Sequence, residues 1–301
     1  MKLNKILSQP KNSQLGAIST GIRNLDNLIG GLHIGHVCAV GARPAMGKTA
    51  FAITLARNIS IINKVPTVLF TMENSENNII KRLMATEFGW GGDNALDSAV
   101  ISSESQDALS MMEGIGFILP AKNKENYLQR MREAPLWIEN GANITLDEVV
   151  ARLERLKKSD NIKVLIIDGL GWLVAGKTYA EKEQAMVKLV QFAKRLNIAI
   201  LVTSELNRSV EIRENSNKKP WLYDLCGGLC IETYSSIVMF IYRPEYYGIT
   251  ENEMGSTNKV AYIIVAKNNF GEVGEIRLRF ENHARFEDDA TIYDNGSDII
   301  T

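Results

Sequence analysis

The sequence predicts an α/β fold, with a mainly parallel, twisted sheet flanked by helices on both faces. Short runs rich in Val, Ile and Leu alternate along the chain with segments whose apolar residues recur at the helical period. The strand-like runs are apolar almost throughout, which is typical of strands that are buried on both faces. The chain has 301 residues, 45% of them hydrophobic, and this is enough to bury a large core.

Eight runs are predicted as strands, at residues 36–41, 67–72, 136–139, 164–168, 199–204, 237–242, 261–266 and 275–280. Five helices are predicted at residues 48–61, 77–88, 105–112, 146–157 and 181–196. A glycine-bearing segment separates the last two strands, so we expect an antiparallel C-terminal β-hairpin. Residues 1–15 are predicted to be a polar tail or linker, 16–301 one domain, and 208–219 a polar surface loop.

The overall charge gives no bulk basic field of the kind that indicates nucleic-acid binding. The formal net charge is -1, so any DNA contact must be local, through a few side chains or backbone amides. The N-terminal residues lack the apolar core of a secretion signal, and no apolar run approaches the roughly 18 residues of a membrane span. We therefore expect a cytoplasmic protein without a membrane segment.

The three cysteines favour a reducing compartment over a metal site or disulfides. Cys38 lies in an apolar strand-like run and is expected to be a small buried hydrophobe. Cys226 and Cys230 are four residues apart, but a zinc site would need two more soft ligands, and the chain has only three histidines.

A phosphate-binding loop is the most specific motif in the chain. Residues 41–49 match G-x-x-x-x-G-K-[ST], and they follow a predicted strand and open a predicted helix. An ordinary glycine-containing turn is the alternative, but the strand–loop–helix context favours a P-loop. Backbone N–H groups would cradle the phosphates, Lys48 would reach the β- and γ-phosphates, and the Thr49 hydroxyl would bind Mg²⁺. The predicted ATP-binding residues are Gly41, Ala42, Arg43, Pro44, Ala45, Met46, Gly47, Lys48, Thr49 and Ala50.

Three further strands end in acidic or polar residues. Asp168 ends an apolar strand, and with a P-loop upstream we expect it to hold the magnesium shell from a strand beside the loop. Glu73 fits two roles equally well on composition alone: general base for the attacking water, or an acid at a helix N-terminus. Glu205 follows Ser204 at a strand end that could sense the γ-phosphate, although an ordinary strand exit explains it as well.

Taken together, these residues resemble the DnaB-type replicative helicases, which carry a RecA-like, hexamer-forming ATPase domain. The resemblance runs from about Ser19 to Phe286 and includes the stretches at 20–32, 238–247 and 264–271. It implies that Glu73 is the catalytic base, that Glu205 lies near the γ-phosphate sensor, and that Lys267 acts on the phosphates of a neighbouring subunit. The family's separate N-terminal helical domain is expected to be absent, because few residues precede the resemblance.

Three positions depart from the family pattern. Glu205 stands where the family usually has Gln, and a carboxylate repels a triphosphate unless it is paired or faces away. Asn269 stands where an arginine finger is usual, and Arg243, Arg277 or Arg279 could replace that finger. The DNA-facing loop has lost its Arg, although the N–H groups of Gly227 and Gly228 could still reach DNA phosphates.

The sequence thus predicts an ATP-dependent DNA helicase or translocase of the DnaB type, which hydrolyses ATP with Mg²⁺ at a subunit interface. Its expected partners are ATP, single-stranded DNA and further copies of itself in a hexameric ring. The alternative is a helicase-derived ATP-binding assembly or regulatory protein with slow hydrolysis, which the neutral Asn269 and the glycine loop favour. A RecA-type recombinase would need similar machinery, but it lacks the resemblance over 238–247.

Overall fold

A nine-stranded sheet organises the computed structural model, which describes residues 16–88, 129–141, 144–213, 218–226, 229–252, 255–281 and 284–289. The strand order is β13-β12-β11-β8-β3-β7-β6-β4-β5. The parallel strands are β8 (Ile237–Tyr242), β3 (Val37–Ala42), β7 (Ala199–Glu205), β6 (Val164–Asp168), β4 (Thr67–Thr71) and β5 (Leu136–Asn140). Antiparallel strands β11 (Val260–Asn268), β12 (Gly274–Glu281) and β13 (Arg285–Asp288) complete one edge.

All eight predicted strands are present, each with ends within two residues of the prediction, and the mainly parallel α/β class is confirmed. The hairpin of β11 and β12 is also confirmed. Local patterning did not reveal β13 or the two-stranded pairs β1 (Ala17–Ile18) with β2 (Leu32–His33) and β9 (Glu251–Asn252) with β10 (Gly255–Ser256). These strands are two to four residues long, too short to display a period.

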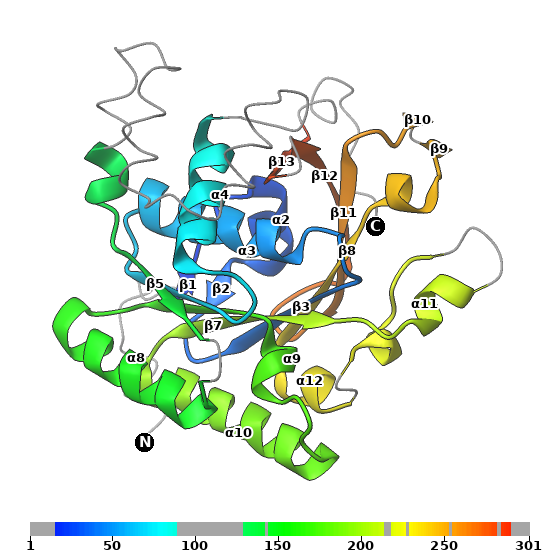
Figure 1. Ribbon diagram of the computed structural model, residues 1–301. Helices are drawn as coiled ribbons and strands as arrows, with labels where there is room; N and C mark the ends of the chain where they lie inside the picture. Colours follow the sequence, from blue (N-terminus) through cyan, green and yellow to red (C-terminus); the bar gives the residue numbers. More distant parts are fainter. Residues whose placement is uncertain are drawn as a thin grey trace, which may run out of the picture.

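Helices cover both faces of the sheet (Figure 1). On one face lie α2 (Arg23–Ile29), α3 (Lys48–Ala56) with its π-helical continuation η1 (Arg57–Ile62), and α4 (Glu76–Phe88). On the other lie α8 (Leu146–Asp160), α9 (Leu170–Leu173), α10 (Tyr179–Leu196) and α12 (Leu229–Tyr234). The short α11 (Ser209–Ile212), η2 (Leu222–Asp224) and η3 (Pro244–Tyr247) lie in loops. The predicted helix at 105–112 lies outside the described residues.

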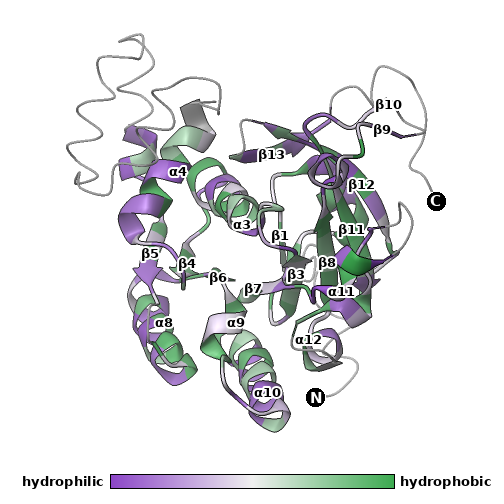
Figure 2. Cartoon of the chain, turned by 45° about the vertical axis from the view of Figure 1, so that its right-hand side comes forward, coloured by the Kyte–Doolittle hydropathy of each residue, from purple (hydrophilic) through white to green (hydrophobic). Residues whose placement is uncertain are grey.

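Two apolar cores form because successive residues of each strand point to opposite faces. On β3, Cys38 and Val40 pack under α3, while Val37 and Ala39 pack toward α10. Every residue of α3 from Ala50 to Ala56 is buried, whereas α8 and α10 are amphipathic, with hydrophilic and hydrophobic residues on different faces (Figure 2). The helix that follows the P-loop is thus held on all sides by the core.

Capping boxes start the two long outer helices. Thr145 and Glu148 cap α8, and Thr178 and Glu181 cap α10. Asn161 and Asn197, both left-handed, end these helices. Among the described segments, none of the helices combines the length and the hydropathy that a membrane span requires.

Candidate functional site

The P-loop sequence forms the loop between β3 and α3. Ala45 and Gly47 both have positive φ, 63° and 101°, which lets the loop turn back toward the start of α3. A Cβ at Gly47 would lie 3.0 Å from Cζ of Phe286, so glycine is needed here for space as well as for conformation. No side chain caps the N-terminus of α3, so its first N–H groups can receive an anion.

The side chains of two buried arginines hold this loop in place. Arg43 donates from Nη1 to the Leu206 carbonyl at 2.6 Å and pairs with Glu211 at 2.9 Å. Arg243 donates to the Ala45 carbonyl at 3.2 Å, and its guanidinium lies 4.3 Å from the centre of the Phe280 ring. Both side chains therefore fix the loop, and the Arg43 side chain points into the protein.

Lys48 lies close to Glu205 and within electrostatic range of the other two predicted strand-end carboxylates, Glu73 and Asp168. Its Nζ is 3.2 Å from the Ala42 carbonyl and 3.9 Å from Oε1 of Glu205. Burial lowers the pKa of Lys48, and the negative charges of Glu205, Glu73 and Asp168 oppose that shift. The structure thus brings together all four side chains that the sequence singled out from separate strands.

Asp168 and Thr49 form a pair suited to a magnesium shell. Thr203 Oγ1 donates to Asp168 Oδ1 at 2.9 Å, and Thr49 makes a side-chain hydrogen bond with the same carboxylate. Burial is the main cause that raises the pKa of Asp168, and these two hydrogen bonds oppose it. One carboxylate and one hydroxyl are a typical protein contribution to Mg²⁺, which keeps waters and phosphate oxygens as its other ligands.

The expectation that Asp168 comes from a strand beside the P-loop strand is wrong. Strand β7 lies between β3 and β6. Thr203 on β7 fills the interval, because its hydroxyl accepts from the Gly169 N–H at 2.8 Å while it donates to Asp168. The carboxylate reaches the P-loop region across one strand.

Glu73 leaves the end of β4, is exposed, and has a partner that the sequence did not reveal. Trp172, on α9, donates from its indole Nε1 to Glu73 Oε1 at 2.7 Å. Trp172 is 63% exposed, which is unusual for so large an apolar side chain. Nothing in the local sequence signals this contact, because the two residues are 99 positions apart.

Lys267 lies toward the end of the sheet where β3 and β8 begin, away from the end where its own P-loop follows β3. In the antiparallel pairing of β11 with β8 it faces Val238, which pairs with Ala39 at the amino-terminal half of β3. Val238 is four residues before Tyr242, which ends β8 on the side of the P-loop, so at about 3.3 Å per residue the two are roughly 13 Å apart. Its Nζ donates to the Glu232 carbonyl of α12 at 2.7 Å. Lys267 does not join the cluster around Lys48.

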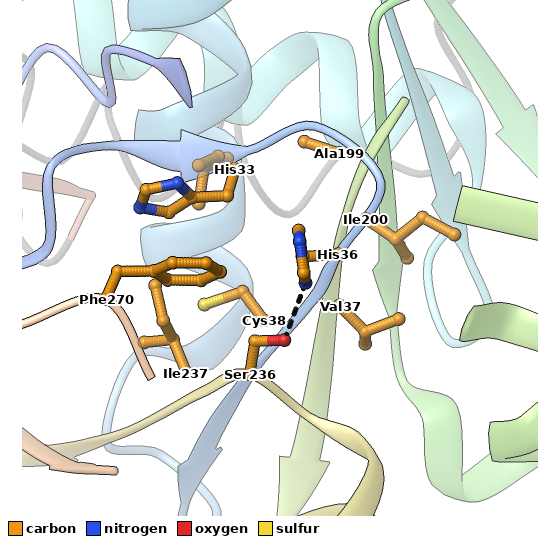
Figure 3. Close-up of a pocket in the computed structure, with 10 residues that line it drawn as sticks. His33, His36, Val37, Cys38, Ala199, Ile200, Ser236, Ile237 and Phe270 are labelled. Atoms are coloured by element: carbon orange, nitrogen blue, oxygen red, sulfur yellow. Dashed lines mark hydrogen bonds between the residues drawn. The ribbon is translucent and has the colours of Figure 1, made fainter. Parts of the chain in front are cut away.

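The turn after Lys267 is fixed against the start of β3 (Figure 3). Asn269 donates its N–H to the Ser236 carbonyl at 2.9 Å. The Phe270 ring stacks on His33, with centroids 3.6 Å apart, and meets His36 edge-on at 4.9 Å. His36 Nδ1 is 2.9 Å from the Ser236 hydroxyl, and burial is the main cause that lowers the His36 pKa. The predicted finger position is therefore presented on a well-packed turn.

Each arginine that could replace the finger is engaged within its own chain. Arg243 pairs with Glu245, Arg277 with Asp289, and Arg279 with Glu281. Cys38 is buried in the core as predicted, and burial raises the pKa of its thiol. Gly227 and Gly228, the predicted DNA-contacting residues, and His283 lie outside the described residues.

A family comparison identifies the chain. The model for the DnaB-like helicase C terminal domain matches residues 17–288. The chain belongs to the DnaB-like helicase C-terminal domain family. Among curated relatives, the replicative DNA helicase DnaB of Treponema pallidum (strain Nichols) is 31% identical over 93% of this chain, and that of Rickettsia felis (strain ATCC VR-1525 / URRWXCal2) is 32% identical over 90%. The chain spans 58% and 57% of those two proteins.

Two solved structures share the fold. One, an ATPase domain, superposes with a TM-score of 0.74 at 22% identity, covering 95% of each chain. The other, a DnaB-like replicative helicase whose structure was described with its interactions with primase, superposes with a TM-score of 0.76 at 23% identity, covering 95% of this chain and 66% of that one. The RecA-like architecture predicted from the resemblance is confirmed.

Proposed function

We propose that this DnaB-family chain is an ATP-driven motor that assembles into a ring and moves on single-stranded DNA. One observation supports the proposal: the residues proposed to bind and cleave ATP gather at the end of the sheet where the parallel strands finish, while Lys267 lies toward the end where they begin. In a ring of such chains, Lys267 of one copy can lie next to the P-loop of the neighbouring copy. Nucleotide turnover would then shift one copy relative to its neighbour.

In this mechanism the P-loop amides and the start of α3 bind the phosphates, and Lys48 supplies a positive charge. Thr49 and Asp168 would hold Mg²⁺, which, when bound, neutralises phosphate charge. Glu73 accepts the proton of the attacking water, and its bond from Trp172 keeps the carboxylate oriented. Lys267 of a neighbouring copy stabilises the charge that develops on the γ-phosphate.

In this mechanism, Glu205 responds to ATP binding. Its carboxylate, 3.9 Å from the Lys48 ammonium, competes with an incoming phosphate for the same cation. It must rotate away or give up this partner when ATP binds, and β7 then reports occupancy of the site to the segment that follows it.

A second function is supported by a specific observation. Asn269 replaces the finger arginine, and the arginines that could substitute for it are paired with acids. A neutral amide cannot supply the charge of a finger, which is worth about 10³–10⁵ in rate. This favours an ATP-binding assembly or regulatory protein with slow hydrolysis.

One assay separates the two functions. ATP turnover is measured with and without single-stranded DNA, beside a native mass measurement of the assembled state. Strong stimulation by DNA in an oligomer supports the motor. A low rate that DNA does not change supports the assembly protein, and strand exchange without unwinding would support a recombinase.

A further inference from the structure

Two exposed aromatic rings lie side by side on a short turn between α11 and α12. Trp221 is 52% exposed and Tyr223 is 68% exposed. Their ring planes differ by only 9°, with centroids 6.5 Å apart. We call this pair the aromatic platform. Large apolar side chains in a soluble fold are normally covered, so an ordered, nearly parallel pair that is left open points to a ligand with a flat face.

The turn that carries the platform is rigid. Asp224 is fully buried, and its Oδ2 accepts the Trp221 N–H at 2.7 Å. The Asp224 N–H returns a bond to the Trp221 carbonyl at 3.0 Å, and Arg213 forms an ion pair with the same carboxylate. The rings are thus pre-organised, which reduces the conformational entropy lost when they bind a ligand.

The cationic side chains Arg208, Arg213 and Lys219 precede the platform along the chain. The Arg213 guanidinium lies 5.2 Å from the centre of the Tyr223 ring, and the side chain of Lys219, which pairs with Glu275, remains about half exposed. Arg208, at the start of α11, is also exposed.

Acids pair with two of these cations, Arg213 with Asp224 and Lys219 with Glu275. The Lys219 side chain stays 46% exposed, so it can still meet a phosphate. Flat aromatic faces among cations are the combination that binds single-stranded nucleic acid, because bases stack on the rings and phosphates meet the charges.

The platform is joined directly to the strand that ends beside the ATP site. Asn207 donates to the Asp224 carbonyl at 2.7 Å, and Leu206 and Leu225 form an antiparallel bridge. The Cys226 N–H donates to the Glu205 carbonyl at 2.8 Å. In Figure 1 this segment lies below α11, next to the end of β7. Backbone hydrogen bonds therefore link the end of β7, where Glu205 lies, to the turn that carries the two rings.

From this geometry we propose that Trp221 and Tyr223 stack on bases of single-stranded DNA. The inference rests on the proposed motor function and adds to it a base contact that backbone amides cannot make. It also fits the net charge of -1, since stacking adds affinity without a basic surface.

The test measures binding of a labelled thymidine oligonucleotide and of an abasic strand of equal length to the full chain, with Mg²⁺ and a non-hydrolysable ATP analogue. Because stacking contributes about 1–3 kcal/mol per base, Trp221→Ala should weaken binding of the thymidine strand roughly 5- to 150-fold. Binding of the abasic strand should not change. Trp221→Phe should retain most of the affinity, and Tyr223→Ala should act like Trp221→Ala.

Two controls isolate stacking from charge and from folding. Tyr179→Ala removes a tyrosine of α10 that is 51% exposed, about as much as Trp221, and should leave both affinities unchanged. Lys219→Ala should reduce the salt dependence of binding, whereas Trp221→Ala should lower affinity by the same factor at low and high salt. The thermal midpoint of each variant checks that the turn still folds.

The outcomes separate this inference from the proposed function. If the parent binds DNA and DNA stimulates its ATPase, but Trp221→Ala and Tyr223→Ala bind as the parent does, the platform is wrong and the motor stands. If both strands lose affinity equally and native mass shows that the oligomer is lost, the platform is a contact between copies instead. If the parent binds neither strand, both proposals are wrong.

Discussion

At the scale of single residues, the proposed ATP site contains a cation close to acids. Only 13% of the Lys48 side chain is exposed, and the charges of Glu205, Glu73 and Asp168 act on it. The sequence identified these residues because each one ends a strand or a P-loop. It could not reveal the Trp172–Glu73 bond or the pairing of Glu205 with Lys48, which depend on contacts between distant segments.

Lys48→Ala should abolish ATP binding without unfolding the chain. The substitution removes the charge that meets the phosphates, while Glu73 and Glu205 are exposed enough for water to solvate them. Lys48→Met keeps the volume of the stem and controls for packing. Equilibrium binding of a fluorescent ATP analogue is the measurement, and a variant that binds as tightly as the parent would refute the site.

Glu73→Gln should keep ATP binding and lose turnover by about 10²–10⁴, because the amide keeps the shape but cannot accept a proton. The matched control is Glu76→Gln, an exposed acid three residues further on, at the start of α4. Single-turnover hydrolysis checks the effect. Unchanged hydrolysis in Glu73→Gln would move the base elsewhere, with Glu205 as the next candidate.

Glu205→Gln should tighten ATP binding. Removing the carboxylate frees Lys48 for the phosphates and removes a repulsive charge. Because Glu205 is half exposed, solvent screens its charge, and we expect a modest gain of roughly two- to fivefold. Titration with the same ATP analogue gives the answer, and weaker binding would mean that Glu205 helps to hold the nucleotide.

At the scale of elements, long apolar strands and capped helices could be predicted, and short elements could not. Helix α2 shows why. Asp288, on β13, accepts the N–H groups of Arg23 and Asn24 at 2.8 and 3.0 Å, so the helix starts on a residue more than 260 positions away. Asp26 then closes the preceding turn by accepting from Thr20. Such caps leave no local pattern in the sequence.

The turn between β11 and β12 presents Asn269 at the predicted finger position. Asn269→Arg should raise ATP turnover in the assembled state by about 10-fold to 10³-fold, less than an evolved finger gives. A guanidinium on this fixed turn would offer paired donors to a neighbour's γ-phosphate. Turnover is followed against protein concentration.

The comparison variants on the hairpin are Arg277→Ala and Arg279→Ala. Both arginines pair with acids of their own chain, so neither substitution should slow the parent. A fast parent that slows sharply when one of them is removed would show that this arginine is the finger.

At the scale of the whole molecule, the two ends of the sheet carry the two sets of residues that the proposed reaction combines. Lys48, Glu73 and Asp168 lie near the carboxyl ends of the parallel strands. Strand β11 runs antiparallel to them, so Lys267, near its carboxyl end, lies toward the opposite end of the sheet. The parallel core and the returning hairpin were predictable from the run of apolar segments. The order of the strands was not, because β7 comes between β3 and β6 only through long-range pairing.

The central claim is that Lys267 of one copy acts on ATP bound at the Lys48 site of a neighbouring copy. Mixing two variants tests this claim most directly. Lys48→Ala and Lys267→Ala are each inactive alone on this account, since every interface then lacks one partner. Mixed before assembly, they form some interfaces with an intact Lys48 from one copy and an intact Lys267 from the other. The predicted result is that ATP turnover reappears on mixing, and a mixture as inactive as its components would contradict the account.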